Sequence, residues 1–106
     1  MNWDANKGIL DSVLDAIGRT PLIRLKKISA DINADICVKL EYANPSGSLK
    51  DRVVHKIVEM AEQRGELKPG MILLEGTTGN TGIATAMVGA AKGYRVIIVM
   101  PEGMTE

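Results

Sequence analysis

Hydrophobic residues recur at helical intervals in three parts of the chain. Residues 9–17 carry apolar side chains at positions 9, 10, 13, 14 and 17, which predicts an amphipathic helix ended by "GRTP" at 18–21. Residues 48–64 predict a second helix, and its apolar stripe comprises Val53, Val54, Ile57, Met60 and Ala61. A third helix, rich in small residues, is predicted from about residue 81 to residue 92, and Gly93 suits the position after a helix C-terminus.

Short apolar runs predict strands between and around these helices. They lie at residues 22–25, 36–42, 71–75 and 95–100. From residue 36 the order is strand, helix, strand, helix, strand, which is typical of a parallel, right-handed unit. We therefore expect an α/β fold class, with a three-layer parallel-sheet βαβαβ unit over residues 35–106. An N-terminal arm and first strand would occupy residues 1–34.

Composition and charge exclude several classes of function. The 13 basic and 13 acidic side chains cancel, which argues against a nucleic-acid partner or an anionic membrane surface. No apolar run approaches the ~20 residues of a membrane span. The polar start "MNWDANKG" has no signal-peptide core, and a single cysteine, Cys37, suits a reducing compartment. A cytoplasmic location is therefore expected.

The end of the chain follows its last apolar strand almost directly, as "VIIVMPEGMTE". Parallel strands are normally covered by helices on both faces of the sheet. We therefore expect the chain to be a fragment of something longer.

Two loops of the predicted unit carry the candidate chemistry. Strand-to-helix loops of a parallel sheet emerge at its carboxyl edge, where ligands of open α/β sheets usually bind. The loops "NPSGSLK" at 44–50 and "EGTTGNTG" at 75–82 are therefore expected to lie near each other.

Lys50 lies in the first turn of the second predicted helix, where the helix dipole disfavours a cation by ~0.3–1 kcal/mol. Ser48 and Asp51 have the spacing of a capping box at this point. One interpretation is that Lys50 is an ordinary solvated lysine. The other is that the dipole and burial depress its pKa, which makes a nucleophilic amine able to form a Schiff base. Its position alone does not decide between them.

The loop at 76–82 has the composition of an anion site. Glycines at 76, 79 and 82 allow close backbone approach, and Thr77, Thr78, Asn80 and Thr81 add hydroxyl and amide donors. With the N–H groups of the following helix these could hold a carboxylate or phosphate. The alternative is a tight turn with helix-capping side chains. The loop matches neither the dinucleotide fingerprint nor a P-loop.

Three stretches together resemble the cysteine synthase and cystathionine β-synthase family, the fold type II pyridoxal-phosphate enzymes. They are "IGRTPLIRL" at 17–25, "NPSGSLKDR" at 44–52 and "EGTTGNTGIATAMVGAAKGYRVIIVMPEGMTE" at 75–106. The resemblance covers nearly the whole chain from residue 9. It implies the N-terminal part of that fold only, because the family's later phosphate-binding loop and the polar residue facing the pyridine nitrogen are not in this sequence.

The resemblance also implies residue roles. Lys50 aligns with the lysine that holds pyridoxal 5'-phosphate as a Schiff base and later removes the substrate α-proton. Asn80 matches the asparagine that hydrogen-bonds the cofactor's ring hydroxyl. The substrate carboxylate would be held by Thr77, Thr78, Gly79, Asn80 and Thr81.

The activity implied is cysteine biosynthesis by β-replacement, from an O-activated serine such as O-acetylserine and from sulfide. The full-length enzyme would be a homodimer, whereas the 106-residue chain alone is expected to bind the cofactor weakly and to turn over little or nothing. A cystathionine β-synthase and a related serine/threonine dehydratase remain alternatives. A different class, a non-catalytic anion-binding α/β fragment, also remains open.

Other noticeable residues have structural interpretations. Cys37 is predicted to pack in the core, and His55, which has no second His or Cys nearby, is predicted on a helix surface with no metal site. Met87 and its small neighbours are predicted to pack closely between helix and sheet. Asp51 and Arg52 are expected to act in capping and surface pairing.

Overall fold

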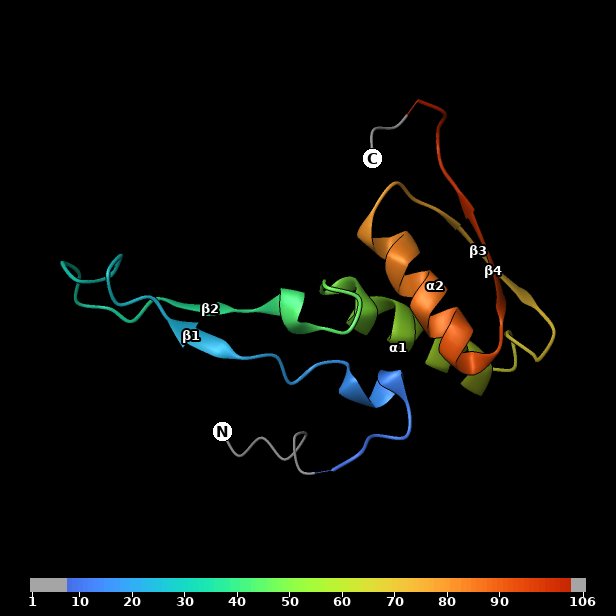
Figure 1. Cartoon of the computed structure of the whole chain (residues 1–106), viewed down its shortest axis with the longest axis horizontal. Helices are drawn as coiled ribbons and strands as arrows, with labels where there is room; N and C mark the ends of the chain where they lie inside the picture. The colour runs from blue at the N-terminus through green and yellow to red at the C-terminus, as the bar shows by residue number, and fades with distance from the viewer. Residues whose placement is uncertain (1–7, 104–106) are drawn as a thin grey trace.

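The computed structural model describes residues 8–103, so most of the polar N-terminus and residues 104–106 lie outside the description. Figure 1 shows a long two-stranded arm that projects from a body of two helices and two strands. The radius of gyration is 17.3 Å. A compact domain of this length would have a radius of about 13 Å. The chain is therefore more open than a self-contained domain.

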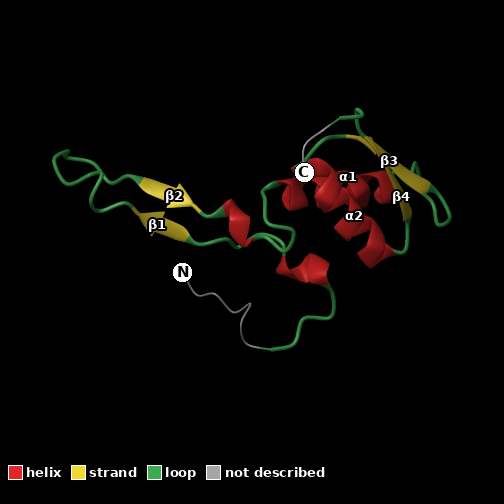
Figure 2. Cartoon of the chain, turned by 45° about the horizontal axis from the view of Figure 1, so that its top comes forward, coloured by secondary structure: helices red, strands yellow, loops and turns green. Residues whose placement is uncertain are grey.

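The arm is an antiparallel pair of short strands, β1 (Leu22–Arg24) and β2 (Cys37–Lys39), in which Ile23 lies opposite Val38. Figure 2 shows this pair standing apart from α1 and α2. The strand predicted at 22–25 is confirmed. The prediction that Cys37 is buried is wrong, because both faces of so thin an arm meet solvent and Cys37 is exposed.

The body contains α1 (Lys50–Gln63), β3 (Ile72–Gly76), α2 (Asn80–Lys92) and β4 (Arg95–Val99). The strands β3 and β4 are parallel, with Leu74 opposite Ile97, so the predicted α/β class with a parallel sheet is confirmed. The C-cap of α2 is Gly93 at φ 82°, as the sequence predicted.

The parallel sheet has one strand fewer than the sequence predicted. The run at 36–42 was expected to begin a βαβαβ unit, but β2 pairs with β1 and the parallel unit is β3–α2–β4. After β2 the Leu40 N–H donates to the Pro21 carbonyl at 2.9 Å, and the chain turns into the 3₁₀ helix η3 (Glu41–Ala43). The alternation of predicted strands and helices gives the order of the elements along the chain. Which strands pair with each other depends on contacts between segments distant in sequence, and these the alternation does not show.

The core lies where α1 crosses α2. Its fully packed apolar side chains are Val54, Val58, Ala84 and Val88. Gly89 brings α2 against the sheet, because a Cβ at this position would lie 2.3 Å from Val96 Cγ2. The predicted close helix–sheet packing is therefore confirmed at Gly89, and Met87 packs against the core from its margin.

A polar cluster joins the C-terminal ends of the two helices. Glu62 of α1 accepts from Lys92 Nζ at 2.6 Å and from the Tyr94 hydroxyl at 2.7 Å. The hydrogen bond from Lys92 is the main cause of a lowered pKa at Glu62. The hydrogen bond to Glu62 raises the pKa of Tyr94, because it stabilises the protonated phenol.

Two helix predictions need correction. The helix expected at 9–17 is only a 3₁₀ turn, η2 (Val13–Ala16), whose Leu14 N–H donates to the hydroxyl of the N-cap residue Ser12. A short helix needs tertiary packing to be stable, and Ile9 is 99% exposed. In the predicted stripe of α1, Val54 is buried, but Val53 and Ile57 are exposed.

Candidate functional site

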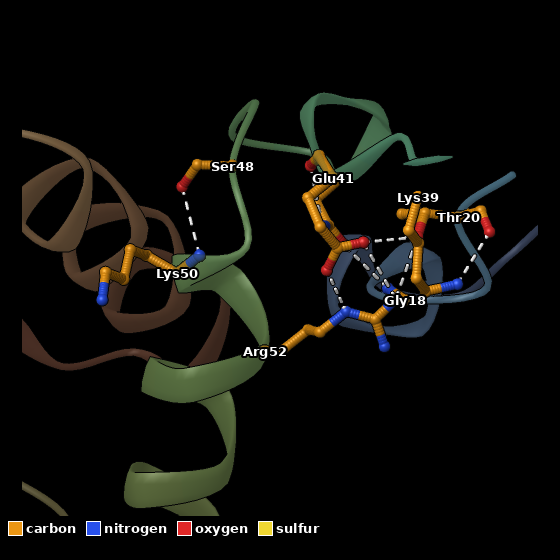
Figure 3. Close-up of polar contacts among 8 residues, drawn as sticks. Gly18, Thr20, Lys39, Glu41, Ser48, Lys50 and Arg52 are labelled. Atoms are coloured by element: carbon orange, nitrogen blue, oxygen red, sulfur yellow. Dashed lines mark hydrogen bonds and ion pairs between the residues drawn. The ribbon is translucent and has the colours of Figure 1, made fainter. Parts of the chain in front are cut away.

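Lys50 is the first residue of α1 and so lies in its first turn, as the sequence predicted, although the helix begins two residues later than expected. Its backbone N–H donates to Ser48 Oγ at 3.1 Å, and Gly47 precedes this contact at φ +98°, a conformation that suits glycine. Figure 3 shows the Lys50 side chain pointing away from the cluster formed around Arg52. The half-buried side chain makes no hydrogen bond or ion pair with any residue from 8 to 103.

Asp51 does not complete the expected capping box. Its carboxylate instead accepts from the Ser46 N–H at 2.8 Å and from the Ser46 hydroxyl, and the residue is completely buried. The expectation of surface pairing at Asp51 is therefore wrong. The carboxylate closes the turn that leads into Lys50, so it acts on the geometry of that turn.

The Arg52 side chain leaves the first turn of α1 on the side opposite to Lys50, and it pairs with Glu41 of η3 (Figure 3). The Nε–Oε1 distance is 2.5 Å, and Nη2 approaches Oε2 at 3.2 Å. The Thr20 hydroxyl donates to Glu41 and accepts from Arg52 Nη2 at 3.0 Å. The guanidinium is the main reason that the pKa of Glu41 falls from 4.5 to about 2.

Two further contacts stabilise this cluster, and the one between Lys39 and Thr20 can be followed in Figure 3. The Gly18 N–H donates to Asn44 Oδ1 at 2.8 Å, and Lys39 Nζ donates to the Thr20 carbonyl at 3.0 Å. Thr20 and Asn44 are both buried. The first two stretches of the family resemblance thus meet around one ion pair. Sequence reasoning missed it because no periodicity relates Glu41 to Arg52, although their opposite charges on either side of a loop were a usable signal.

The second loop lies between β3 and α2. The Thr77 N–H continues the sheet by donating to the Val99 carbonyl at 3.0 Å, and the Gly79 N–H donates to Thr77 Oγ1 at 3.2 Å. Gly79 is the N-cap of α2 and Asn80 is its first residue. Thr81 accepts through its carbonyl from the Thr85 hydroxyl at 2.7 Å.

Close packing fixes the shape of this loop. A Cβ on Gly82 would lie 2.6 Å from Thr77 Cγ2, so the glycine lets the first turn of α2 approach the loop. A shallow hollow beside the loop is lined by Thr77, Thr78, Gly79, Gly82, Ile83, Ala86, Ile98 and Met100. Lys50 is not among these residues. Figure 1 nevertheless shows both helices beginning on the side of the body next to the arm.

Residues 8 to 103 contain neither a candidate metal site nor a candidate membrane-spanning helix. No group of three or more His, Cys, Asp or Glu side chains gathers there as a metal site requires. Within the same residues, no helix has the length and apolar character needed to cross a membrane.

Comparisons with known proteins converge on one group. Residues 13–106 match the family described as "Pyridoxal-phosphate dependent enzyme". Cysteine synthase B of Salmonella typhimurium is 47% identical over 97 residues, which are 92% of this chain and 32% of that protein. Cystathionine beta-synthase of Dictyostelium discoideum is 46% identical over 100 residues, or 94% of this chain and 20% of that protein.

A solved structure agrees with these relatives. The cysteine synthase of Entamoeba histolytica superposes with a TM-score of 0.88 at 47% identity, covering 94% of this chain and 31% of that one. The chain therefore spans about a third of the cysteine synthases that it matches, and less of the cystathionine beta-synthase.

Proposed function

The chain belongs to the pyridoxal-phosphate dependent enzyme family, and from this premise we propose that it is the N-terminal portion of a cysteine synthase. Its fold is an incomplete part of the fold type II architecture. The proposed reaction replaces the β-substituent of an O-activated serine with sulfide. The supporting observation is an amine, Lys50, at the start of one helix and a Thr/Asn/Gly loop at the start of the helix packed beside it.

The side chains present fit pyridoxal phosphate. Lys50 supplies a primary amine that no described carboxylate neutralises, and Asn80 supplies an amide at the start of α2. When bound, the cofactor supplies an electron sink for the electron pair left at the substrate α-carbon. Lys50 would hold the cofactor and, once released from it, take the proton from that carbon. Asn80 would donate to the ring hydroxyl.

The loop would hold the substrate carboxylate. The start of α2 would suit an anion, because the helix dipole favours negative charge at a helix N-terminus. The Thr77 hydroxyl already accepts from Gly79, which leaves its own hydrogen available to donate. Thr78 and Thr81 would add donors, so that the α-carbon lies in a defined place relative to Lys50.

A cystathionine β-synthase activity is the second candidate. The Dictyostelium relative of that name is 46% identical, close to the 47% of the Salmonella cysteine synthase. Both activities would use the same lysine and carboxylate loop. The two activities are distinguished by the products formed in a full-length enzyme that contains these residues. Cysteine formation from O-acetylserine and sulfide is compared with cystathionine formation from serine and homocysteine.

Borohydride reduction in the presence of pyridoxal phosphate tests the role of Lys50. Mass spectrometry should find the reduced adduct at Lys50 in preference to the other lysines, and Lys50→Arg should remove it. Lys56→Arg is the matched control, because Lys56 lies on the same helix in a surface pair with Glu59. An adduct spread evenly over the lysines, or its absence from Lys50 even in a full-length parent, would instead favour an anion-binding module.

A further inference from the structure

The backbone that carries Lys50 is held by hydrogen bonds, whereas its side chain is not. The Lys50 N–H donates to Ser48 Oγ at 3.1 Å, and the Ser46 N–H donates to the buried Asp51 carboxylate at 2.8 Å. The Lys50 side chain makes no hydrogen bond or ion pair within residues 8–103. The place that the amine can reach is therefore set by where the first turn of α1 lies.

Arg52 connects this turn to a segment distant in sequence. The local contacts between residues 46 and 51 shape the turn but do not place it against the rest of the protein. The Arg52 guanidinium reaches Glu41 through two nitrogens and the Thr20 hydroxyl through one of them (Figure 3). Two such N–H···O contacts define the orientation of a guanidinium as well as its distance. Thr20 is 1% exposed, so the connection ends on a buried residue.

The backbone around Gly18 is shaped to receive this guanidinium. Gly18 has φ +85°, and a Cβ there would lie 3.1 Å from Arg52 Nη1, so the glycine leaves room for the approach. The next residue, Arg19, has φ +50°, a left-handed conformation that is uncommon for a residue with a side chain. Such strain persists only where surrounding contacts determine the backbone. Here they come from Arg52 and from Asn44, whose Oδ1 accepts from the Gly18 N–H at 2.8 Å.

The first turn of α1 contains two cations, Lys50 and Arg52, although the helix dipole disfavours positive charge there. The stability of the helix by itself therefore explains neither of them. Glu41 offsets the charge of Arg52, whereas the Lys50 amine has no ion-pair partner within residues 8–103. At 3.6 residues per turn the two side chains leave the helix about 200° apart, so the ion pair does not obstruct the amine.

We propose that Arg52 is a positioning residue for Lys50. Its two-point pair with Glu41, bridged by a buried hydroxyl, fixes the first turn of α1 and so sets where the amine meets pyridoxal phosphate and the substrate α-carbon. Arg52 acts through the helix and need not touch either molecule. The inference rests on the proposed function of Lys50 and adds a second residue to it. Misplacement of a reacting group by about 1 Å costs roughly 100-fold in rate, so a modest shift of the turn would be measurable.

Borohydride reduction with pyridoxal phosphate reports the placement of the amine without turnover. In a full-length enzyme that contains these residues, the rate of adduct formation at Lys50 should fall about tenfold or more in Arg52→Met. Thr20→Val removes the bridging hydroxyl at nearly constant shape and should also slow labelling, whereas Thr20→Ser keeps the hydroxyl and should restore it. In turnover, Arg52→Met should lower kcat more than it raises KM, because the loop proposed to bind the substrate carboxylate is unchanged.

A control separates placement from stability. Gly89→Ala introduces a clash between α2 and Val96, so it should lower the urea midpoint and leave labelling of Lys50 unchanged. Circular dichroism checks that each variant is folded under the labelling conditions. If Arg52→Met labels Lys50 at the parent's rate, or if Gly89→Ala slows labelling equally at the same loss of stability, the ion pair serves stability alone. The positioning role then fails and the proposed function stands. A parent without preferential labelling at Lys50 would overturn the proposed function, and the positioning role with it.

Discussion

Arg52 and Glu41 form a two-point ion pair that joins the start of α1 to the segment leaving the arm. Arg52 lies two residues beyond Lys50 in sequence, and Figure 3 shows the lysine pointing away from the ion pair. The guanidinium therefore anchors one side of the first helical turn, and the amine occupies another. This relationship and other contacts between distant segments lead to four predictions.

The first prediction concerns acid stability. The pKa of Glu41 is lowered from 4.5 in the unfolded chain to about 2 in the folded one. Its contribution to stability is therefore present above pH 4.5 and is lost as the pH falls toward 2. We expect Glu41→Gln to lower the urea midpoint at pH 6, and the gap between variant and parent to close by about pH 2. Urea titrations followed by circular dichroism at several pH values measure this.

Glu59→Gln is the control for that experiment. Glu59 pairs with Lys56 one turn away on an exposed surface, a geometry worth little to stability. Its urea midpoint should follow that of the parent at each pH. A constant gap for Glu41→Gln down to pH 2 would show that the ion pair is not the origin of its stabilisation.

The second prediction concerns Gly89. Replacing a helical glycine with alanine ordinarily stabilises a protein by about 0.5–1 kcal/mol. Here the new Cβ would lie 2.3 Å from Val96 Cγ2, and overpacking of this kind costs about 1–3 kcal/mol. We expect Gly89→Ala to lower the free energy of unfolding by about 1 kcal/mol or more. Removing the clash in Gly89→Ala/Val96→Ala should make the alanine at 89 less costly than it is alone, and a fully additive double mutant would contradict the clash.

The third prediction concerns Tyr94. Its hydrogen bond to Glu62 raises its pKa above 10.0, so ionisation of the phenol should be delayed in the folded protein. In a Tyr42→Phe background, absorbance near 295 nm reports Tyr94 as the sole tyrosine. Adding Glu62→Gln should move the titration midpoint toward 10.0, and adding Glu59→Gln should not. The stability linked to this group is present below pH 10.0 and is lost as the pH rises through the elevated pKa.

The fourth prediction concerns Asp51. Removing its carboxylate in Asp51→Ala leaves the Ser46 N–H without its buried acceptor, which costs about 1–3 kcal/mol. Asp51→Asn should cost less, because the amide oxygen can still accept. Urea unfolding measures both. If the turn positions the neighbouring amine, labelling of Lys50 should fall further in the Ala variant than in the Asn variant, and equal labelling would limit Asp51 to a role in stability.

Local sequence determined much of this protein. Propensity and hydrophobic periodicity predict the helices at 50–63 and 80–92, the helix end at Gly93, and the strands at 72–76 and 95–99. Each of these features depends on neighbours within a few residues of sequence. The three family-like stretches are also local, and the family match over residues 13–106 agrees with them. Assigning the roles of Lys50 and the loop at 77–81 needed only that resemblance, and those roles remain predictions.

Only the tertiary structure decided which segments meet. Pairing of β2 with β1, burial of Asp51 and the ion pair between Arg52 and Glu41 all depend on contacts that no periodicity encodes. The exposure of Val53 and Ile57 depends likewise on what packs against α1. Hydrophobic patterning indicates which side chains favour burial, but a side chain is buried only when another part of the protein packs against it. The face of the β3–β4 sheet that carries Leu74 and Ile97 has no such packing partner within the described residues.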